Sequence, residues 1–222
     1  MAPVGTLYGA SFQRQTIVIK TAAAIAGLEL NLAEIKLGET NKSPAYLAKF
    51  PQGKIPAFED AEGFILTEGL AIVNYIVSLA PESGLQGQTK KEAAEVEQWT
   101  HFAEFELQVS SDFTWYLATG YFPGYNKDFH TILLDRQYSA LDHLERHLTR
   151  HEYLVGGRLT LADIVLAGSI KDAVGITLGT AERARYPKTF AHFNKVISHP
   201  KIKQVFGEIE FVETPLQHKG SA

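Results

Sequence analysis

Strand signals stop after roughly the first third of this 222-residue chain, and that change limits the folds it can adopt. Up to residue 80, short strand-like segments alternate with helix-like ones. Further on, apolar residues recur only at helical spacing, as in Leu134, Tyr138, Leu141, Leu144 and Leu148. The segment between these regions, PESGLQGQTKK, is rich in proline, glycine and polar residues, as linkers between domains are. An α/β domain followed by an all-helical domain is therefore expected.

Within residues 1–80 the pattern predicts the order β-α-β-α-β-β-α. The strand GTLYGA is followed by a helix from about Phe12 to Ala26 and by the alternating segment LELNLAEI. Ser43-Pro44 is a typical helix start, AFED and FILTE form a hairpin, and a helix follows from Gly69 to Leu79. The expected boundaries are an α/β domain over 1–80, a linker over 81–91, an all-helical domain over 92–213 and a frayed tail over 214–222.

The composition excludes several classes of protein. With 45% hydrophobic residues and a net charge of −4, the chain is an ordinary globular one, and it lacks the clustered basic residues that bind nucleic acid or an anionic membrane. Its longest apolar stretch is broken by Lys20, and no signal peptide is recognisable, so a cytoplasmic protein is expected. There is no cysteine, which excludes disulfides, thiolate metal sites and cysteine nucleophiles. Any thiol chemistry must use the sulfur of a substrate.

The segment FPQGKIPAF, residues 50–58, places Pro56 where a strand begins. Proline has no backbone N–H, so it is tolerated at the first position of a strand, and Pro56 can simply mark that position. The alternative is a cis Ile55–Pro56 bond, a minority state that folds keep for a local geometric reason. The segment alone leaves both interpretations open.

The segment LTEGLAI, residues 66–72, places Glu68 and Gly69 at the start of a helix. Free amides and the positive end of the helix dipole favour an anion there. Glu68 can simply complement that dipole. Alternatively, the amides bind the carboxylate of an amino acid while Glu68 accepts its ammonium group.

Motifs for other chemistry are largely missing. The sequence has no GxSxG, HExxH, Walker loop or GxGxxG at a helix start. His143 and His147 are spaced to share a metal, but they point away from the apolar stripe of their helix, so a solvated polar face is expected and no metal site. Thr160 and Asp163 predict a capping box, which is a folding signal.

Taken together, the β-α-β-α order, the proline at a strand start, the hairpin and the Glu-headed helix resemble the thioredoxin-like domain of cytosolic glutathione transferases. Nearly the whole chain also resembles the transferase-like region of the gamma subunit of elongation factor one. That likeness lies in GTLYGA, TNKSPAYLAKFPQGKIPAFED, VEQWTHFAEF and HPKIKQVFGEIEF. LVGGRLTLADI is similar to a structural signature of the superfamily's second domain. The resemblance implies a glutathione transferase fold, with a cis-proline in its thioredoxin-like domain.

The resemblance also implies a glutathione site. Ile55 would pair its backbone with the cysteinyl backbone of glutathione, as an added strand would. Lys42 and Lys54 lie where related transferases place polar or basic residues near the glycyl carboxylate, although each can equally be a solvated surface lysine. Glu68 matches the acid of the family's Glu-Ser pair for the γ-glutamyl group, but Gly69 keeps only the amide and lacks the hydroxyl. The expected glutathione-binding residues are Lys42, Lys54, Ile55, Pro56, Glu68 and Gly69.

Catalysis in this family lowers the pKa of the glutathione thiol, about 8.5 for a free thiol, so that a thiolate forms at neutral pH. The donors would lie in GASFQRQ, at the junction of the first strand and first helix, where the dipole also favours a thiolate. Related transferases often use a serine near this junction. When the two sequences are aligned without gaps from Leu7, Gln13 stands at the position of that serine. We rank Arg14 first, Ser11 second and Gln13 third. Tyr8 points to the other face of its strand and is expected in the core.

The aromatic run DFTWYLATGYFPGY, residues 112–125, is a second candidate region. Its side chains Trp115, Tyr116 and Tyr121 would wall an apolar pocket for the electrophile, or the run is simply core.

Two functions are compatible with these features. The first is a homodimeric glutathione transferase of a detoxification type, which conjugates glutathione to small electrophiles or reduces organic hydroperoxides. The second is a non-catalytic or weakly catalytic interaction module among the subunits of a translation elongation factor. An elongation-factor gamma chain would continue into a further domain, so the end of this sequence favours the enzyme. Disulfide reduction by a cysteine nucleophile is excluded because the chain has no cysteine.

Overall fold

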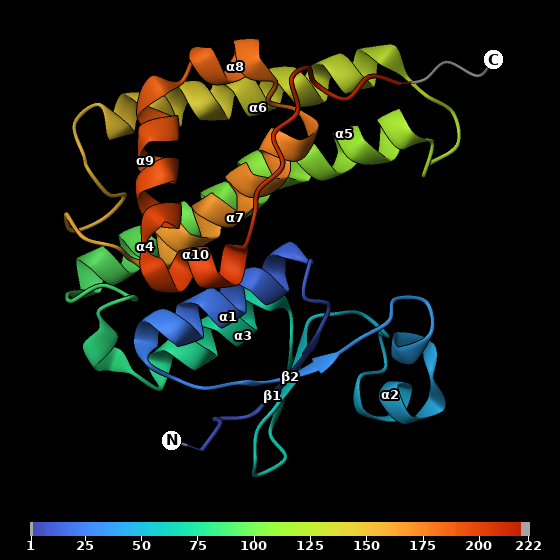
Figure 1. Cartoon of the computed structure of the whole chain (residues 1–222), viewed down its shortest axis with the longest axis vertical. Helices are drawn as coiled ribbons and strands as arrows, with labels where there is room; N and C mark the ends of the chain where they lie inside the picture. Colours follow the sequence, from blue (N-terminus) through green and yellow to red (C-terminus); the bar gives the residue numbers. More distant parts are fainter. Residues whose placement is uncertain (1, 219–222) are drawn as a thin grey trace. The chain divides into compact units, whose positions relative to one another are not determined.

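The computed structural model describes residues 2–218, which form two compact units (Figure 1). Unit 1 comprises Met1–Gln86 and Pro200–Phe206, and unit 2 comprises Gly87–His199 and Gly207–Ala222. The division after Gln86 falls inside the segment 81–91, which the sequence predicts to be a linker and which begins with the short 3-10 helix η2, Pro81–Ser83.

Unit 1 contains a four-stranded sheet with the strand order β2-β1-β3-β4. The strands are β1 (Thr6–Gly9), β2 (Asn31–Glu34), β3 (Ala57–Glu59) and β4 (Ile65–Thr67). β1 and β2 run parallel, whereas β1 with β3 and β3 with β4 are antiparallel. A parallel pair needs a long crossover, and α1 (Arg14–Ala26) supplies it. The predicted order β-α-β-α-β-β-α is confirmed.

Two helices cover one face of this sheet. α1 and α3 (Gly69–Ser78) lie side by side (Figure 1), and fully buried residues such as Leu7, Phe58 and Ile72 fill the core. A second, smaller cluster contains Ile35, Tyr46, Phe50 and Ala57, with Tyr8 and Ile55 packed against it. It includes α2 (Pro44–Lys49), which follows the 3-10 turn η1 (Thr40–Lys42) and starts at the predicted cap, since Ser43 Oγ accepts a hydrogen bond from Tyr46 N at 3.3 Å.

The last helix, α10 (Pro200–Phe206), belongs to unit 1 although it follows the helical region in the sequence. It packs on α1, with Ile202 and Phe206 buried. Lys201 Nζ donates a hydrogen bond to the carbonyl of Ala24 in the last turn of α1, at 2.7 Å. The expected helical domain over 92–213 is therefore wrong in this segment, because an amphipathic pattern does not identify which surface a helix covers.

Unit 2 is all-helical over its described residues, as predicted. Its helices are α4 (Lys90–Phe102), the π-helix η3 (Ala103–Gln108), α5 (Val109–Thr119), α6 (Lys127–Leu148), α7 (Leu161–Ile176), α8 (Thr180–Ala184) and α9 (Pro187–Ser198). α7 is buried along most of its length and forms the centre of this unit's core. Among residues 2–218, no helix combines the length and the apolar character that crossing a bilayer requires.

The predicted capping box begins α7 and is confirmed. Asp163 accepts hydrogen bonds at 2.8 Å from the amide and from the hydroxyl of Thr160. The same carboxylate, fully buried, also accepts from Leu154 N at 2.9 Å and from His192 Nε2 at 2.8 Å. It therefore joins the start of α7, the loop before it and α9.

The segment after α10 returns to unit 2 and is attached there. Val212 N donates to the carbonyl of Val174 at 2.9 Å, and Leu216 N donates to that of Ile176 at 2.7 Å. The ring of His218 stacks on Tyr125 with 4.0 Å between centroids. The expectation of a frayed tail is thus wrong for residues 214–218, because backbone hydrogen bonds and stacking hold them; residues 219–222 lie outside the described part of the chain.

Candidate functional site

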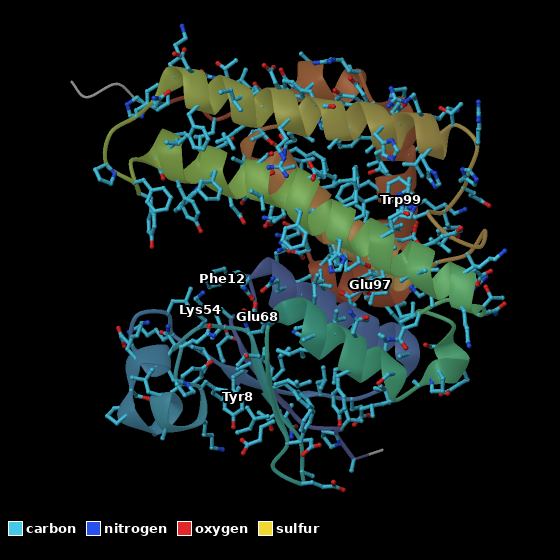
Figure 2. The ribbon with its side chains drawn as sticks, turned by 180° about the vertical axis from the view of Figure 1, so that it is seen from behind. Tyr8, Phe12, Lys54, Glu68, Glu97 and Trp99 are labelled. Carbon is cyan, nitrogen blue, oxygen red and sulfur yellow. The ribbon has the colours of Figure 1, made fainter. Side chains whose placement is uncertain are left out.

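A cavity of about 220 Å³ opens in unit 1 beside Ile55 and Pro56. Its walls come from the start of α1, from the segment between α2 and β3, and from the junction of β4 with α3. Figure 2 shows two of its charged side chains, Lys54 and Glu68, near each other. The lining residues are Gln15, Phe50, Gln52, Lys54, Ile55, Pro56, Thr67, Glu68 and Gly69.

Most of the residues predicted to bind glutathione meet at this cavity, namely Lys54, Ile55, Pro56, Glu68 and Gly69. Lys42 is not in its lining; its Nζ donates to the carbonyl of Gly53 at 3.4 Å. Sequence reasoning missed Gln15, Phe50, Gln52 and Thr67. Gln52 and Thr67 could have been found, because each lies within two residues of a predicted site residue. Gln15 follows Arg14, a residue predicted for thiol activation, but no local pattern places it beside the predicted glutathione-binding residues.

Ile55 lines the cavity, and its side chain packs against the small core cluster. The Ile55–Pro56 peptide bond is cis, so the second interpretation of Pro56 is confirmed. Within the described residues the Ile55 N–H has no hydrogen-bond acceptor. Its carbonyl accepts only a long hydrogen bond, 3.5 Å, from Gln13 Nε2. The amide is therefore available to an extended ligand, and the carbonyl is only weakly engaged.

Glu68 precedes α3 with a backbone φ of 69° and ψ of 116°. It is the one non-glycine residue with positive φ in the part of the chain that the structure describes. That conformation is unfavourable for a residue with a Cβ, and such strain is often kept at binding sites. Its carboxylate makes no capping hydrogen bond to α3. The exposed side chain is thus left for the cavity, next to the helix amides that lack intrahelical acceptors.

Gly69, the first residue of α3, lies under the side chain of Gln15. A Cβ on residue 69 would come within 2.6 Å of Gln15 Cδ and 2.8 Å of its Oε1. These distances are too short for a real contact, so a side chain on residue 69 would force the Gln15 side chain to move.

The three residues ranked for thiol activation lie at the junction of β1 and α1, outside the lining of the cavity. Ser11 is exposed, and its backbone N–H donates to Glu34 Oε1 at 2.8 Å. Gln13 caps α1, its Oε1 accepting from Thr16 N at 3.1 Å and from Thr16 Oγ1 at 2.7 Å. Arg14 begins α1 with only 8% of its surface exposed. Their roles in catalysis remain predictions.

Tyr8 is not a member of this junction. Its ring packs on Phe50, with 5.1 Å between centroids, and its hydroxyl donates to Glu59 Oε2 at 2.9 Å. Burial and that carboxylate raise the pKa of the Tyr8 hydroxyl. Raising the pKa opposes ionisation, so Tyr8 is a structural tyrosine.

The aromatic residues predicted for the electrophile cluster at the end of α5 and in the following turn of unit 2. The ring of Tyr116 lies 5.0 Å from that of Tyr121, and Trp115 lies 6.0 Å from Tyr121. Trp115 is 39% exposed and Tyr121 is 66% exposed, so these two rings are not core residues, whereas Leu117 and Ala118 of the same run are buried. Burial raises the pKa of the Tyr116 hydroxyl. Unit 2 therefore carries an accessible aromatic surface.

Of the two histidines predicted to lie on a solvated polar face, His143 is exposed, but His147 departs from that prediction. The ring of His147 is half-buried against Trp99, with 4.4 Å between centroids, and its Nε2 donates to the carbonyl of Leu154 at 3.0 Å. His143, although exposed, also stacks on Trp99. The partner Trp99 lies on α4, far away in sequence, which is why periodicity along α6 missed it. Within residues 2–218 no cluster of three or more His, Cys, Asp or Glu could hold a metal ion.

Burial lowers the pKa of His147, so acid should weaken the fold through this residue. Between the lowered pKa and about 6.5, the value for unfolded histidine, the unfolded chain binds the proton and the folded chain does not. The free energy of unfolding should therefore fall as pH drops below 6.5. Urea titrations at pH 7.5 and 5.5 should show a smaller fall in His147→Gln than in the wild type. An exposed control, His101→Gln, should behave as the wild type, and an unchanged pH dependence in His147→Gln would contradict the assignment.

Two family models match the chain. Residues 3–78 match "Glutathione S-transferase, N-terminal domain" and residues 108–200 match "Glutathione S-transferase, C-terminal domain". Among curated proteins, the glutathione S-transferase-like protein LUC7 of Fusarium sp is 34% identical over 99% of this chain and 100% of its own length. Elongation factor 1-gamma of Artemia salina is 35% identical over 86% of this chain but only 44% of its own length.

Solved structures agree with these matches. The GST-like domain of elongation factor 1-gamma from Saccharomyces cerevisiae has a TM-score of 0.85 and 27% identity, covering 98% of this chain and 99% of that one. The glutathione transferase URE2P6 of Phanerochaete chrysosporium, solved with oxidised glutathione, has a TM-score of 0.83 at 21% identity, over 92% and 96% of the two chains, and shows the shared fold.

A thioredoxin-like unit with a cavity at its cis-proline, together with an all-helical unit, defines the transferase class of fold. The chain belongs to the glutathione S-transferase family. The resemblance to the transferase-like region of elongation factor 1-gamma is confirmed as well.

Proposed function

We propose that this protein is a cytosolic glutathione transferase, which binds glutathione in the cavity of unit 1 and activates its thiol for attack on small electrophiles. The observation that carries the proposal is the meeting of a free backbone amide at Ile55 with the carboxylate of Glu68 at one cavity. A peptide ligand with an amino acid head needs both. At about 220 Å³ the cavity is smaller than the roughly 300–1,000 Å³ of sites that enclose a whole small ligand, so it encloses the tripeptide only in part.

Each of the three residues of glutathione has its own proposed binding partner. The ammonium group of the γ-glutamyl head binds the carboxylate of Glu68, and its carboxylate binds the free amides at the start of α3. The cysteinyl backbone pairs with Ile55, as an added strand would. The glycyl carboxylate binds Lys54, whose exposed ammonium group can reach it without losing its hydration.

Activation requires that the thiolate be favoured over the thiol. The start of α1 supplies a helix dipole, the permanent charge of Arg14 and the donors of Ser11 and Gln13. Because Arg14 is largely buried, its charge is less screened by water than a surface charge would be. The thiol proton passes to solvent, and the thiolate attacks an electrophilic carbon to form a C–S bond. With an aryl halide, the halide departs with the electron pair.

The aromatic surface of unit 2 is proposed to bind the electrophile. Trp115, Tyr116 and Tyr121 offer ring faces to an apolar or aromatic substrate.

The proposed active form is a homodimer. Light scattering coupled to size-exclusion chromatography should then report a mass near twice 24.5 kDa, and a monomer mass would contradict the dimer.

Thiol activation is tested by the pKa of bound glutathione, followed through thiolate absorbance. We expect Arg14→Gln and Ser11→Ala each to raise that pKa, by about one unit for a single lost donor or charge. Conjugation to an activated aryl halide should fall about tenfold near pH 6.5 and recover at high pH, where the thiol ionises unaided. The matched controls are Arg150→Gln and Ser139→Ala, which change exposed residues of unit 2.

The outcomes separate the proposed residues from the proposed function. An unchanged thiol pKa in Arg14→Gln, Ser11→Ala and a third variant, Gln13→Ala, would overturn the assignment of the activating groups. Failure of the wild type to be retained on immobilised glutathione would overturn glutathione binding itself.

A second function is favoured by the relatives named elongation factor 1-gamma. In that case unit 1 and unit 2 form an interaction module of a translation factor complex, and the fold serves assembly. This chain spans less than half of the Artemia protein, so that whole protein's role is not carried over. Retention on glutathione without any turnover of an aryl halide or a hydroperoxide would favour the module over the enzyme.

A further inference from the structure

At Gly69 an added side chain would meet a steric obstacle, whereas the backbone conformation presents none. Its φ is not positive, so a residue with a side chain could adopt the same backbone. The obstacle is Gln15, since an added Cβ would lie 2.6 Å from Cδ, 2.8 Å from Oε1 and 3.0 Å from Cβ of that side chain. Gln15 therefore fills the volume that a side chain on residue 69 would occupy.

The carboxamide of Gln15 lies where a ligand can reach it. Gln15 is half-buried in the second position of α1, and it lines the cavity together with Glu68 and Gly69. No hydrogen bond joins this carboxamide to another residue of the described chain. A half-buried amide without partners can still donate through Nε2 and accept through Oε1.

We propose that Gln15 is a specificity-determining residue, which donates a hydrogen bond from Nε2 to the α-carboxylate of the bound amino acid head. This inference rests on the proposed glutathione binding. The carboxamide lies directly over Gly69, the first residue of α3. The free amides at this N-terminal end of the helix attract the carboxylate. The oxygen and nitrogen of a glutamine amide exchange places by rotation about its last bond, so Nε2 can turn toward an anion. A carboxylate takes donors on both oxygens, and Gln15 supplies one of them.

A consequence is that residues 15 and 69 are coupled. Gly69→Ser alone forces the Gln15 side chain aside and should weaken binding. Gln15→Ala removes the obstacle, so that a serine at position 69 fits. Two contacting residues that share one space should give non-additive effects.

The test is calorimetric titration of the full chain with glutathione and two analogues. Gln15→Ala should weaken glutathione binding about tenfold, as expected for the loss of one hydrogen bond to a charged group. For an analogue that lacks the α-carboxylate, γ-aminobutyryl-cysteinyl-glycine, wild type and variant should bind equally. For glutaryl-cysteinyl-glycine, which lacks only the amino group, the tenfold difference should persist.

Two further variants separate a donor from a space-filling side chain. Gln15→Glu keeps the shape but loses the donor and adds a negative charge, so it should bind glutathione more weakly than Gln15→Ala does. In Gln15→Ala/Gly69→Ser, the loss of affinity should be smaller than the two single losses combined. Gln88→Ala, which removes an exposed glutamine outside the cavity, is the matched control. Thermal unfolding of each variant checks that the fold is intact.

Each outcome has one meaning. Glutathione affinity unchanged in Gln15→Ala, or retained in Gln15→Glu, would overturn the role of Gln15 while leaving the proposed function in place. A loss that persists with the analogue lacking the α-carboxylate would overturn the assignment to that group. A wild type that binds none of the three ligands would overturn the proposed function, and the inference with it.

Discussion

Glu68→Gln should remove most of the protein's affinity for glutathione, with an expected loss of about 100-fold. A hydrogen bond to a charged group contributes roughly 1.5–3 kcal/mol, and each 1.4 kcal/mol is a factor of ten. Glutamine keeps the size and the acceptor of the side chain but not the negative charge that the ammonium group requires. Since the carboxylate makes no capping hydrogen bond to α3, the loss should come from binding and not from the helix. Titration calorimetry measures it directly.

A second variant at the same position separates binding from stability. Glu68 has a φ of 69°, which a residue with a Cβ adopts only under strain. Glu68→Gly should therefore stabilise the fold, by about 1 kcal/mol on the scale of such strain, while it loses glutathione. Glu62→Gln, an exposed acid outside the cavity lining, should leave both quantities unchanged. If Glu68→Gln binds glutathione as the wild type does, the proposed contact with the ammonium group is wrong.

Asp163→Ala should destabilise the protein by about 3–5 kcal/mol, the usual cost of breaking a buried, hydrogen-bonded charged group. The carboxylate is fully buried and accepts from four donors, which belong to Thr160, Leu154 and His192. Removing it leaves these donors without an acceptor in the core. The midpoint of thermal unfolding should fall by roughly 6–20 °C, at about 2–4 °C per kcal/mol for a chain of this size.

The control for this prediction is an exposed aspartate of unit 2. Asp135→Ala changes a residue on the surface of α6 and should shift the free energy of unfolding by no more than about 0.5 kcal/mol. The loss of stability in Asp163→Asn should lie between those of Asp163→Ala and Asp135→Ala. An amide still accepts hydrogen bonds through one oxygen, but it adds donors that need partners. Equal stability of Asp163→Ala and Asp135→Ala would contradict the role assigned to the carboxylate.

The sequence predicts the features that depend on neighbouring residues and misses those that depend on distant ones. Pro56 and Glu68 are recognisable because a proline at a strand start and an acid at a helix start have local meaning. The capping box of Asp163 is local as well, although its contact with His192 is not. Gly69 at first suggests only a lost hydroxyl. That Gln15 fills the space above it depends on how α1 meets α3, which no spacing within the chain reveals.

The same limit explains two errors of interpretation. The helical stripe of α6 places His147 on the outer face, but α4 brings Trp99 against it. The stripe of α10 would suit either unit, and only the packed structure assigns it to α1. Periodicity identifies an apolar face, whereas its partner is decided by three-dimensional packing.

The place of α10 has a consequence for synthesis on the ribosome. The first 86 residues emerge long before Pro200–Phe206, yet those last residues cover part of α1 and supply Lys201 to its final turn. Until they emerge, the apolar surface that Ile202 and Phe206 will bury stays open to water and to other chains. Unit 1 is therefore first in the chain but among the last parts to be completed, and a fragment that ends before residue 200 should aggregate more readily than the whole protein.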